Sequence, residues 1–221
     1  MALAQQFGTT PKLLRRELST LLRASYMPLG QAADVLRPRG YEVDTELSIE
    51  GATVISSEVT GPIVLFRGTT SGSDWVRENL PLIVGVDGPR HEAARALVAR
   101  VEAKYGRPAH AIGHSLGGRL AERSGASGLV LTAGKAAGLA DLEPQSNPRQ
   151  LDVLVDGDPV SALSRGGLRE RLPIQYTGSQ LMAEMDHERE LRLIQRLPEP
   201  IKRWIARGLA AHSLENYRHD R

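Results

Sequence analysis

The chain contains no cysteine among its 221 residues. Disulfide bonds, catalysis by a thiolate and zinc sites built on cysteine are therefore excluded. No stretch approaches the run of about 18 apolar residues that a membrane-spanning helix needs. The first residues, MALAQQFGTTPKLLRRELSTLL, lack a charged segment followed by an apolar run, which argues against a classical signal peptide. These absences predict a soluble protein that is cytoplasmic by default.

An excess of charge of one sign is also missing. The 28 basic and 26 acidic residues leave a net charge of +2, so we expect no nucleic-acid partner. Almost all the positive charge is arginine, which we interpret as composition and not as a binding signal. We find no zinc-type motif and therefore expect neither a metal ion nor a cofactor. The oligomeric state is left open.

What is present is ordinary for a globular protein, with 41% hydrophobic and 24% charged residues. The length suits a single α/β domain over residues 1–221, with residues 1–60 as N-terminal helices and a hairpin. Short apolar strands alternate with helices between residues 62 and 155. Such alternation predicts the α/β class, with a mostly parallel central sheet and helices on both faces.

The individual elements follow from local patterns. Helical spacing over 12–36 is interrupted by Pro28 and Gly30, and β-branched residues around Gly51 predict a hairpin over 41–59. We expect strands at 63–66, 110–112, 128–132 and 151–155, and helices at 90–105 and 116–123. A helix capped by Ser73 or Asp74 is expected to continue to 80. The last third reads as mainly helical, with candidate helices at 181–197 and 201–217.

One motif carries chemistry: Gly113-His114-Ser115-Leu116-Gly117 fits the pattern G-x-S-x-G. In this pattern the serine occupies a sharp, strained turn from strand to helix, and the flanking glycines let the strand and the helix approach closely. The helix N-terminus and the amide of the next residue favour developing negative charge. The alternative is an inert serine in a glycine-rich turn.

Four segments in order resemble the class 3 (fungal-type) lipases of the α/β-hydrolase superfamily. They are Phe66-Arg67-Gly68-Thr69 with Asp74-Trp75, then 113–118 (GHSLGG), 157–160 (GDPV) and 212–217 (HSLENY). The resemblance implies the α/β-hydrolase fold and a catalytic triad of Ser115, Asp158 and His212. It also implies an oxyanion hole formed by Thr69 and the amide of Leu116. Residues 86–90 and 134–138 depart from the family's usual sequences.

Each assignment has an alternative. Asp156 competes with Asp158, and Asp156-Gly157-Asp158 is also compatible with a plain turn. Thr69 could serve only as a turn residue at the end of a strand. The other histidines are interpreted as structural or solvated: His91, His110, His114, His187 and His219.

The resemblance also implies a lid after the oxyanion residue, over 71–86. Its apolar residues either cover the serine or belong to the core: Trp75, Val76, Leu80, Leu82 and Ile83. A further apolar stripe within 201–209 packs on the sheet or rests on anionic lipid. We expect a lipase or phospholipase acting on lipid esters, with peripheral contact to a lipid interface. A short-chain esterase or thioesterase, and a non-catalytic binding protein in a larger assembly, are the alternatives.

Overall fold

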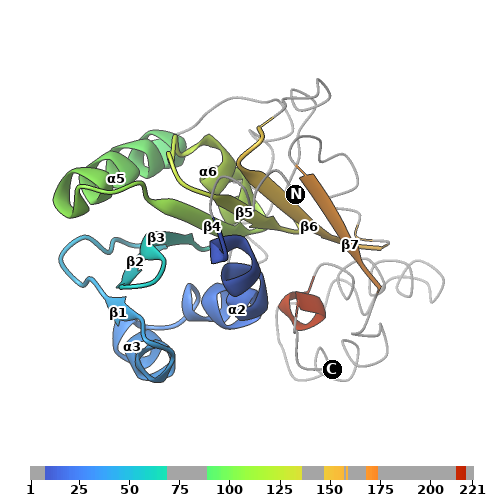
Figure 1. Cartoon of the computed structure of the whole chain (residues 1–221), viewed down its shortest axis with the longest axis horizontal. Helices are drawn as coiled ribbons and strands as arrows, with labels where there is room; N and C mark the ends of the chain where they lie inside the picture. The colour runs from blue at the N-terminus through green and yellow to red at the C-terminus, as the bar shows by residue number, and fades with distance from the viewer. Residues whose placement is uncertain are drawn as a thin grey trace, which may run out of the picture.

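A seven-stranded sheet organises the molecule, with its strands in sequence order from β1 to β7 (Figure 1). The computed structural model describes residues 8–68, 89–135, 147–156, 158, 168–173 and 213–217. The antiparallel part contains β1 (Glu42–Val43), β2 (Ala52–Ser57) and β3 (Gly61–Phe66). From β3 onward all neighbours are parallel: β4 (His110–His114), β5 (Val130–Ala133), β6 (Gln150–Val155) and β7 (Leu168–Leu172).

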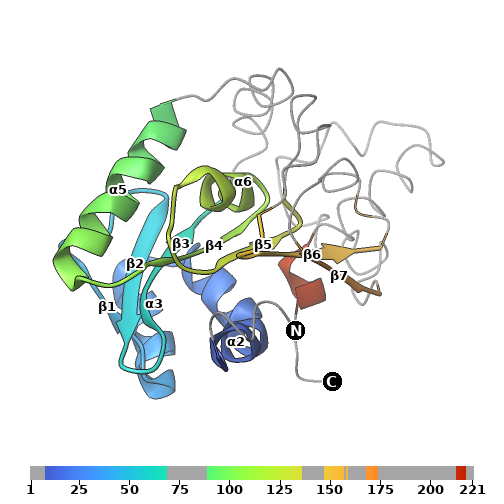
Figure 2. The ribbon, with the colours of Figure 1, turned by 45° about the horizontal axis from the view of Figure 1, so that its top comes forward.

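Helices cover both faces of this sheet. α5 (Pro89–Tyr105) and α6 (Leu116–Arg123) lie on one face. The other face is covered by α2 (Thr10–Ala24), α3 (Leu29–Leu36) and the 3₁₀ helix η4 (Leu214–Tyr217) (Figure 2). A short 3₁₀ turn, η1 (Arg37–Arg39), follows α3. Right-handed crossovers between parallel strands in sequence order place the connecting helices α5 and α6 on the same face. The predicted α/β class, with a mostly parallel sheet between helices, is confirmed.

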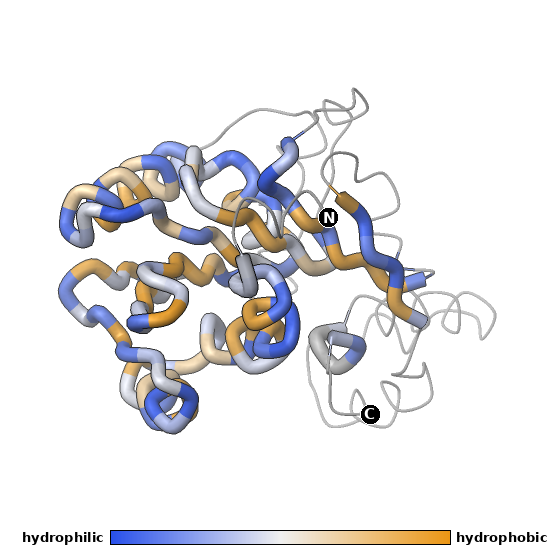
Figure 3. The backbone as a smooth tube through the Cα atoms, viewed as in Figure 1, coloured by the Kyte–Doolittle hydropathy of each residue, from blue (hydrophilic) through white to orange (hydrophobic). Residues whose placement is uncertain are grey.

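The strand β3 shows how both faces are filled. Ile63 and Leu65 belong to the core beneath α2 and α3, whereas Val64 and Phe66 belong to the core beneath α5 and α6. All six residues of β3 are buried, as expected for a short apolar run in a sheet covered on both sides. Figure 3 shows the central strands as mainly hydrophobic and the middle of β7 as hydrophilic.

The predicted helices correspond closely to the observed ones. The N-terminal helical region is divided into α2 and α3, and Pro28 lies directly before α3. α5 ends before Gly106, whose φ of +60° suits glycine. α6 has the predicted bounds. Among the described residues, no helix combines the length and apolar composition needed to cross a bilayer.

The predicted hairpin over 41–59 is present as the antiparallel pair β1–β2, with Glu42 opposite Ser56 and Val43 opposite Ile55. Its other strand, β2, also pairs antiparallel with β3. Two predictions about elements differ from the structure. The strand β7 was not predicted, since its region was expected to be helical. The predicted helix over 201–217 is wrong at its described end, where residues 214–217 form a 3₁₀ turn. The predicted helices at 74–80 and 181–197 lie outside the described residues.

Candidate active site

Ser115 lies in the turn that joins β4 to α6. Its backbone has φ 56° and ψ −125°, and it is the one non-glycine residue with positive φ in the described part of the chain. Such a conformation costs about 1–3 kcal/mol for a residue with a Cβ. The amide of Ser115 donates to the carbonyl of Ala133 at 3.0 Å, and its carbonyl accepts from the amide of Gly118 at 3.0 Å. The surrounding backbone therefore holds the serine in this strained turn.

Gly113 and Gly117 allow the two sides of the turn to approach each other. A Cβ on Gly113 would collide with the backbone carbonyl of Gly117, and a Cβ on Gly117 would collide with the carbonyl of Phe66. No shift of a side chain relieves either collision, because the obstructing atoms are backbone. The strand–turn–helix context predicted for G-x-S-x-G is confirmed.

The segment after β3 lies against this turn. β3 and β4 are parallel neighbours, and their last paired residues are Phe66 and Gly113. A Cβ on Gly68 would lie 2.8 Å from the carbonyl oxygen of His114 and 3.2 Å from Cβ of Ser115. Thr69, the predicted oxyanion residue, lies outside the described residues. Leu116, whose amide is the second predicted donor, is buried at the first position of α6.

Tyr26, in the turn between α2 and α3, connects these two segments. Its hydroxyl accepts a hydrogen bond from the amide of Gly68 at 3.0 Å and lies 3.1 Å from Nδ1 of His114. Burial raises the pKa of Tyr26 to about 12, so the hydroxyl keeps its proton at neutral pH. Tyr26 was not predicted from the sequence, because it is separated from its partners by 42 and 88 positions and belongs to no motif.

The two candidate acids have different surroundings. Asp158 is 3% exposed, and its amide donates to the carbonyl of Val155 at the end of β6. Asp156 is exposed, and its carboxylate accepts a hydrogen bond from Arg171 on β7 at 3.3 Å. Asp156 is thus engaged at the surface, whereas the carboxylate of Asp158 lies in the interior.

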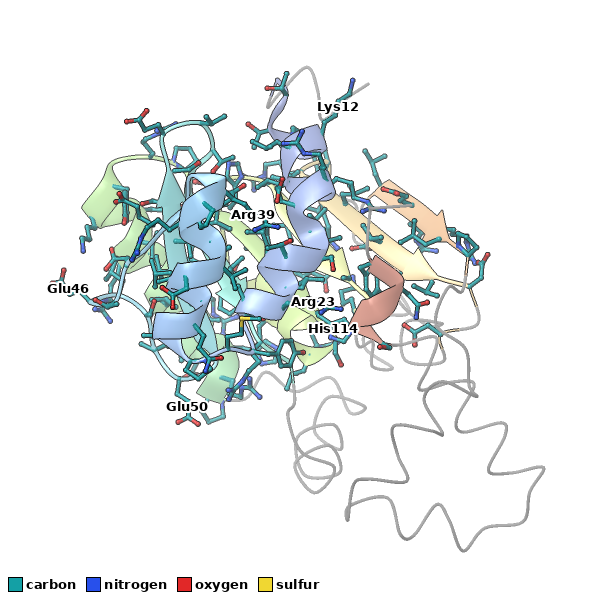
Figure 4. The ribbon with its side chains drawn as sticks, turned by 90° about the horizontal axis from the view of Figure 1, so that it is seen from below. Lys12, Arg23, Arg39, Glu46, Glu50 and His114 are labelled. Carbon is teal, nitrogen blue, oxygen red and sulfur yellow. The ribbon has the colours of Figure 1, made fainter. Side chains whose placement is uncertain are left out.

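The C-terminal segment reaches the nucleophile turn through Tyr217. This side chain is fully buried, and its ring centroid lies 5.8 Å from that of His114 in an edge-to-face arrangement. Figure 4 shows His114 between the end of α2 and η4. Burial and the charge of Asp158 raise the pKa of Tyr217, so that carboxylate lies within electrostatic reach of Tyr217. His212, the predicted base, lies outside the described residues.

Three histidines lie among the described residues, His91, His110 and His114, and all three are buried. His91 is buried in the first turn of α5. Nδ1 of His110 accepts a hydrogen bond from the amide of Leu129 at 2.8 Å, and its Nε2 lies 3.1 Å from the carbonyl oxygen of Thr60. His110 and His114 are four residues apart on β4. His110 contacts the backbone of Thr60 and Leu129, whereas His114 contacts the side chains of Tyr26 and Tyr217.

A buried polar network lies between α6 and the strands β5 and β6. Lys135, which is 1% exposed, contacts Glu122 of α6 at 2.5 Å and the fully buried Asp152 at 3.6 Å. Asp152 also accepts hydrogen bonds from Thr132 and from Gln150. Burial raises the pKa of Asp152, although Lys135 acts in the opposite direction. The network fixes α6, and with it the turn at Ser115, to the sheet.

A model of a known protein family matches most of the chain. A family model described as phospholipase-like, Tle-like phospholipase domain, matches residues 15–180. The matched range includes the greater part of α2, the nucleophile turn and Asp158. This is a lipase-type domain, and the match does not specifically indicate the class 3 lipases. Searches among curated proteins and among solved structures found no match.

Proposed function

Because this chain belongs to the family of Tle-like phospholipase domains, we propose that it is a serine hydrolase that cleaves carboxylic ester bonds of phospholipids. The observation that carries the proposal is the strained backbone of Ser115 between β4 and α6. Backbone strain in a tightly held turn is concentrated at functional positions, where it directs a side chain that reacts. An inert serine in the same turn would gain nothing from that strain.

In the proposed reaction, Oγ of Ser115 attacks the ester carbonyl carbon while His212 accepts the hydroxyl proton. The amide of Leu116 and Thr69 donate hydrogen bonds to the resulting oxyanion. The carbon–oxygen bond then breaks, and His212 returns the proton to the leaving lysophospholipid. Water hydrolyses the acyl-enzyme by the same route and releases the fatty acid. Asp158 orients the imidazole and stabilises its charged form.

Two observations support Asp158 and His212 as partners of Ser115. Asp158 is buried within electrostatic reach of Tyr217, whereas the carboxylate of Asp156 pairs with Arg171 at the surface. Tyr217 follows His212 by five residues, and its ring packs on His114, the neighbour of Ser115. We further infer that the sheet is that of a single α/β-hydrolase domain, in keeping with the four lipase-like segments of the sequence.

A fluorophosphonate probe tests the nucleophile. The intact mass of the wild-type protein should rise by one adduct, and Ser115→Ala should remain unlabelled. Ser19→Ala, on the partly exposed side of α2, is the matched control and should label like the wild type. An unlabelled wild-type protein, or a labelled Ser115→Ala variant, would refute the assignment.

Release of fatty acid from phosphatidylcholine vesicles tests the substrate. We expect release by the wild-type protein and none by Ser115→Ala. Triacylglycerol emulsions and soluble short-chain esters are assayed in parallel. They distinguish a phospholipase from a triacylglycerol lipase and from a short-chain esterase. Cleavage of short-chain esters alone would replace the phospholipase assignment by that of an esterase, and no turnover on any of them would favour the non-catalytic alternative.

A further inference from the structure

The hydroxyl of Tyr26 joins two segments that flank the reacting atoms. It accepts the hydrogen bond of the Gly68 amide at 3.0 Å and contacts Nδ1 of His114 at 3.1 Å. Gly68 directly precedes Thr69, the proposed oxyanion residue, and His114 directly precedes Ser115. The hydroxyl oxygen of Tyr26 therefore contacts the residue before the proposed oxyanion residue and also the residue before the proposed nucleophile.

The peptide group between Arg67 and Gly68 is held by two side chains: the Arg67 carbonyl accepts a hydrogen bond from Arg90 at 3.3 Å, and the Gly68 amide donates to Tyr26 at 3.0 Å. The ladder between β3 and β4 ends at the pair Phe66–Gly113, so Gly68 lies beyond the hydrogen bonds of the sheet. A Cβ on Gly68 would lie 2.6 Å from the hydroxyl oxygen of Tyr26 and 2.8 Å from the carbonyl oxygen of His114. Tyr26 and the nucleophile turn thus enclose this residue closely, and the tyrosine hydroxyl accepts its amide hydrogen.

The directions of the two hydrogen bonds are compatible with each other. Because burial raises the pKa of Tyr26 to about 12, its hydroxyl is protonated at neutral pH. One lone pair accepts from Gly68, and the hydroxyl proton is available to His114. We assign Nδ1 of His114 as the acceptor, which makes Nε2 the protonated nitrogen of that ring.

The same side chains extend the connection to the C-terminal segment. The rings of Tyr26 and His114 lie 6.3 Å apart at 63°, and those of His114 and Tyr217 lie 5.8 Å apart at 71°. Both are edge-to-face arrangements of the kind that stabilises aromatic pairs. Figure 4 shows His114 where α2 and η4 approach the end of β4. The N-terminal helices thereby contact the nucleophile turn and the segment that follows His212.

From this geometry we propose that Tyr26 is a positioning residue, which holds the oxyanion segment in register with the nucleophile turn. The inference rests on the proposed function and extends it, because it makes the turn between α2 and α3 part of the catalytic site. Hydrogen-bond donors of an oxyanion hole act only if they are placed within a few tenths of an ångström of their working positions. Loss of the Tyr26 hydroxyl should therefore slow the chemical step and leave substrate binding nearly unchanged.

The test is Tyr26→Phe, which keeps the ring on His114 and removes only the hydroxyl. We expect kcat to fall by about 10-fold to 100-fold with KM changed less than about 3-fold. The rate constant for fluorophosphonate labelling should fall by the same factor, because that reaction also develops charge at the oxyanion hole. Tyr105→Phe is the matched control. Its hydroxyl donates to Asp44 at 3.0 Å, away from the nucleophile turn, so kcat should remain that of the wild type.

Hydrogen exchange at residues 61–68 provides a readout that does not depend on activity. In Tyr26→Phe the amide of Gly68 should exchange faster, while the amides of β3 keep their protection. Equal kcat in Tyr26→Phe and Tyr105→Phe would overturn the inference, as would unchanged exchange at Gly68. A wild-type protein without turnover that depends on Ser115 would instead refute the proposed function, and the exchange measurement would still decide whether Tyr26 anchors Gly68.

Discussion

At the scale of single residues, the turn around Ser115 combines an unfavourable backbone conformation with close backbone packing. The strain at Ser115 persists because hydrogen bonds to Ala133 and from Gly118 fix the turn on both sides. The close approach of strand and helix needs hydrogen atoms, not methyl groups, at Gly113 and Gly117. The two requirements are independent, so they can be tested separately.

We expect Gly117→Ala to destabilise the protein by about 3 kcal/mol or more, because its Cβ would meet the backbone of Phe66 and Arg67. For a chain of this length, that loss corresponds to a fall in Tm of about 10 °C, measured by circular dichroism. Gly30→Ala, in α3, is the control. A methyl group at Gly30 would meet no atom of the described residues within 4 Å, so alanine should be neutral or stabilising there. Equal Tm values for Gly117→Ala and the wild type would contradict the steric argument.

The residues of the site differ in how far they can be predicted from sequence. The turn at Ser115 is predictable, because its steric requirements appear as glycines at fixed spacing within a few positions. Tyr26 is not predictable in this way, because its role depends on hydrogen bonds to Gly68 and His114 that form only in the folded chain. The choice of Asp158 over Asp156 rested on a resemblance, since two aspartates on either side of one glycine are locally equivalent.

At the scale of elements, Glu102 connects the last turn of α5 to two strands. Its Oε1 accepts hydrogen bonds from the amide of Ala109 before β4 at 3.0 Å, and from the amide and hydroxyl of Ser127 before β5 at 3.0 and 2.6 Å. Burial alone would raise the pKa of Glu102, but the hydrogen bonds from Ser127 and Ala109 outweigh it and lower the pKa below its ordinary value of 4.5. The folded state therefore favours the ionised carboxylate.

Glu102→Gln should lower the free energy of unfolding by about 1 kcal/mol at neutral pH, because a neutral acceptor replaces a charged one. Since the pKa is lowered on folding, the contribution of the carboxylate is fully present above pH 4.5. It is lost as the pH falls through the folded-state pKa. Urea unfolding at neutral pH and at about pH 3 measures the effect. The difference in the free energy of unfolding between wild type and variant should be smaller at about pH 3 than at neutral pH. Glu58→Gln, in the exposed turn after β2, should show no such trend; a constant difference for Glu102→Gln would contradict the assignment.

The elements that were predicted well from sequence are those with the clearest burial. β3, β4, β5 and β6 are almost wholly buried, so their apolar runs mark them. β7 was missed because Leu168–Leu172 carries Arg169, Glu170 and Arg171 and is partly exposed. Glu170 accepts two hydrogen bonds from Arg15 of α2, at 2.8 and 2.7 Å. That ion pair joins residues 155 positions apart, and no local pattern indicates it.

At the scale of the whole molecule, the parallel strands bring separate parts of the proposed site to one edge of the sheet. Gly68 follows β3, Ser115 follows β4 and Asp158 follows β6. In sheets of this kind ligands bind beyond the carboxyl ends of the strands. The segments 69–88 and 136–146, which follow Gly68 and Lys135 in the chain, lie outside the described residues. The prediction of substrate preference therefore rests on the sequence of these segments.

The apolar residues that follow Thr69 in the sequence, and that are expected to form a lid, predict a preference for longer acyl chains presented at an interface. Exposing such residues is costly unless they cover an apolar group or meet lipid, and each buried methylene of an acyl chain contributes about 0.8 kcal/mol. We therefore expect kcat/KM to rise about 4-fold per methylene until the acyl site is filled. Nitrophenyl esters from acetate to palmitate measure the trend, and emulsified or bilayer substrates measure the effect of an interface. Highest activity on acetate or butyrate esters, with no increase in rate above their solubility limit, would instead indicate a short, open acyl site.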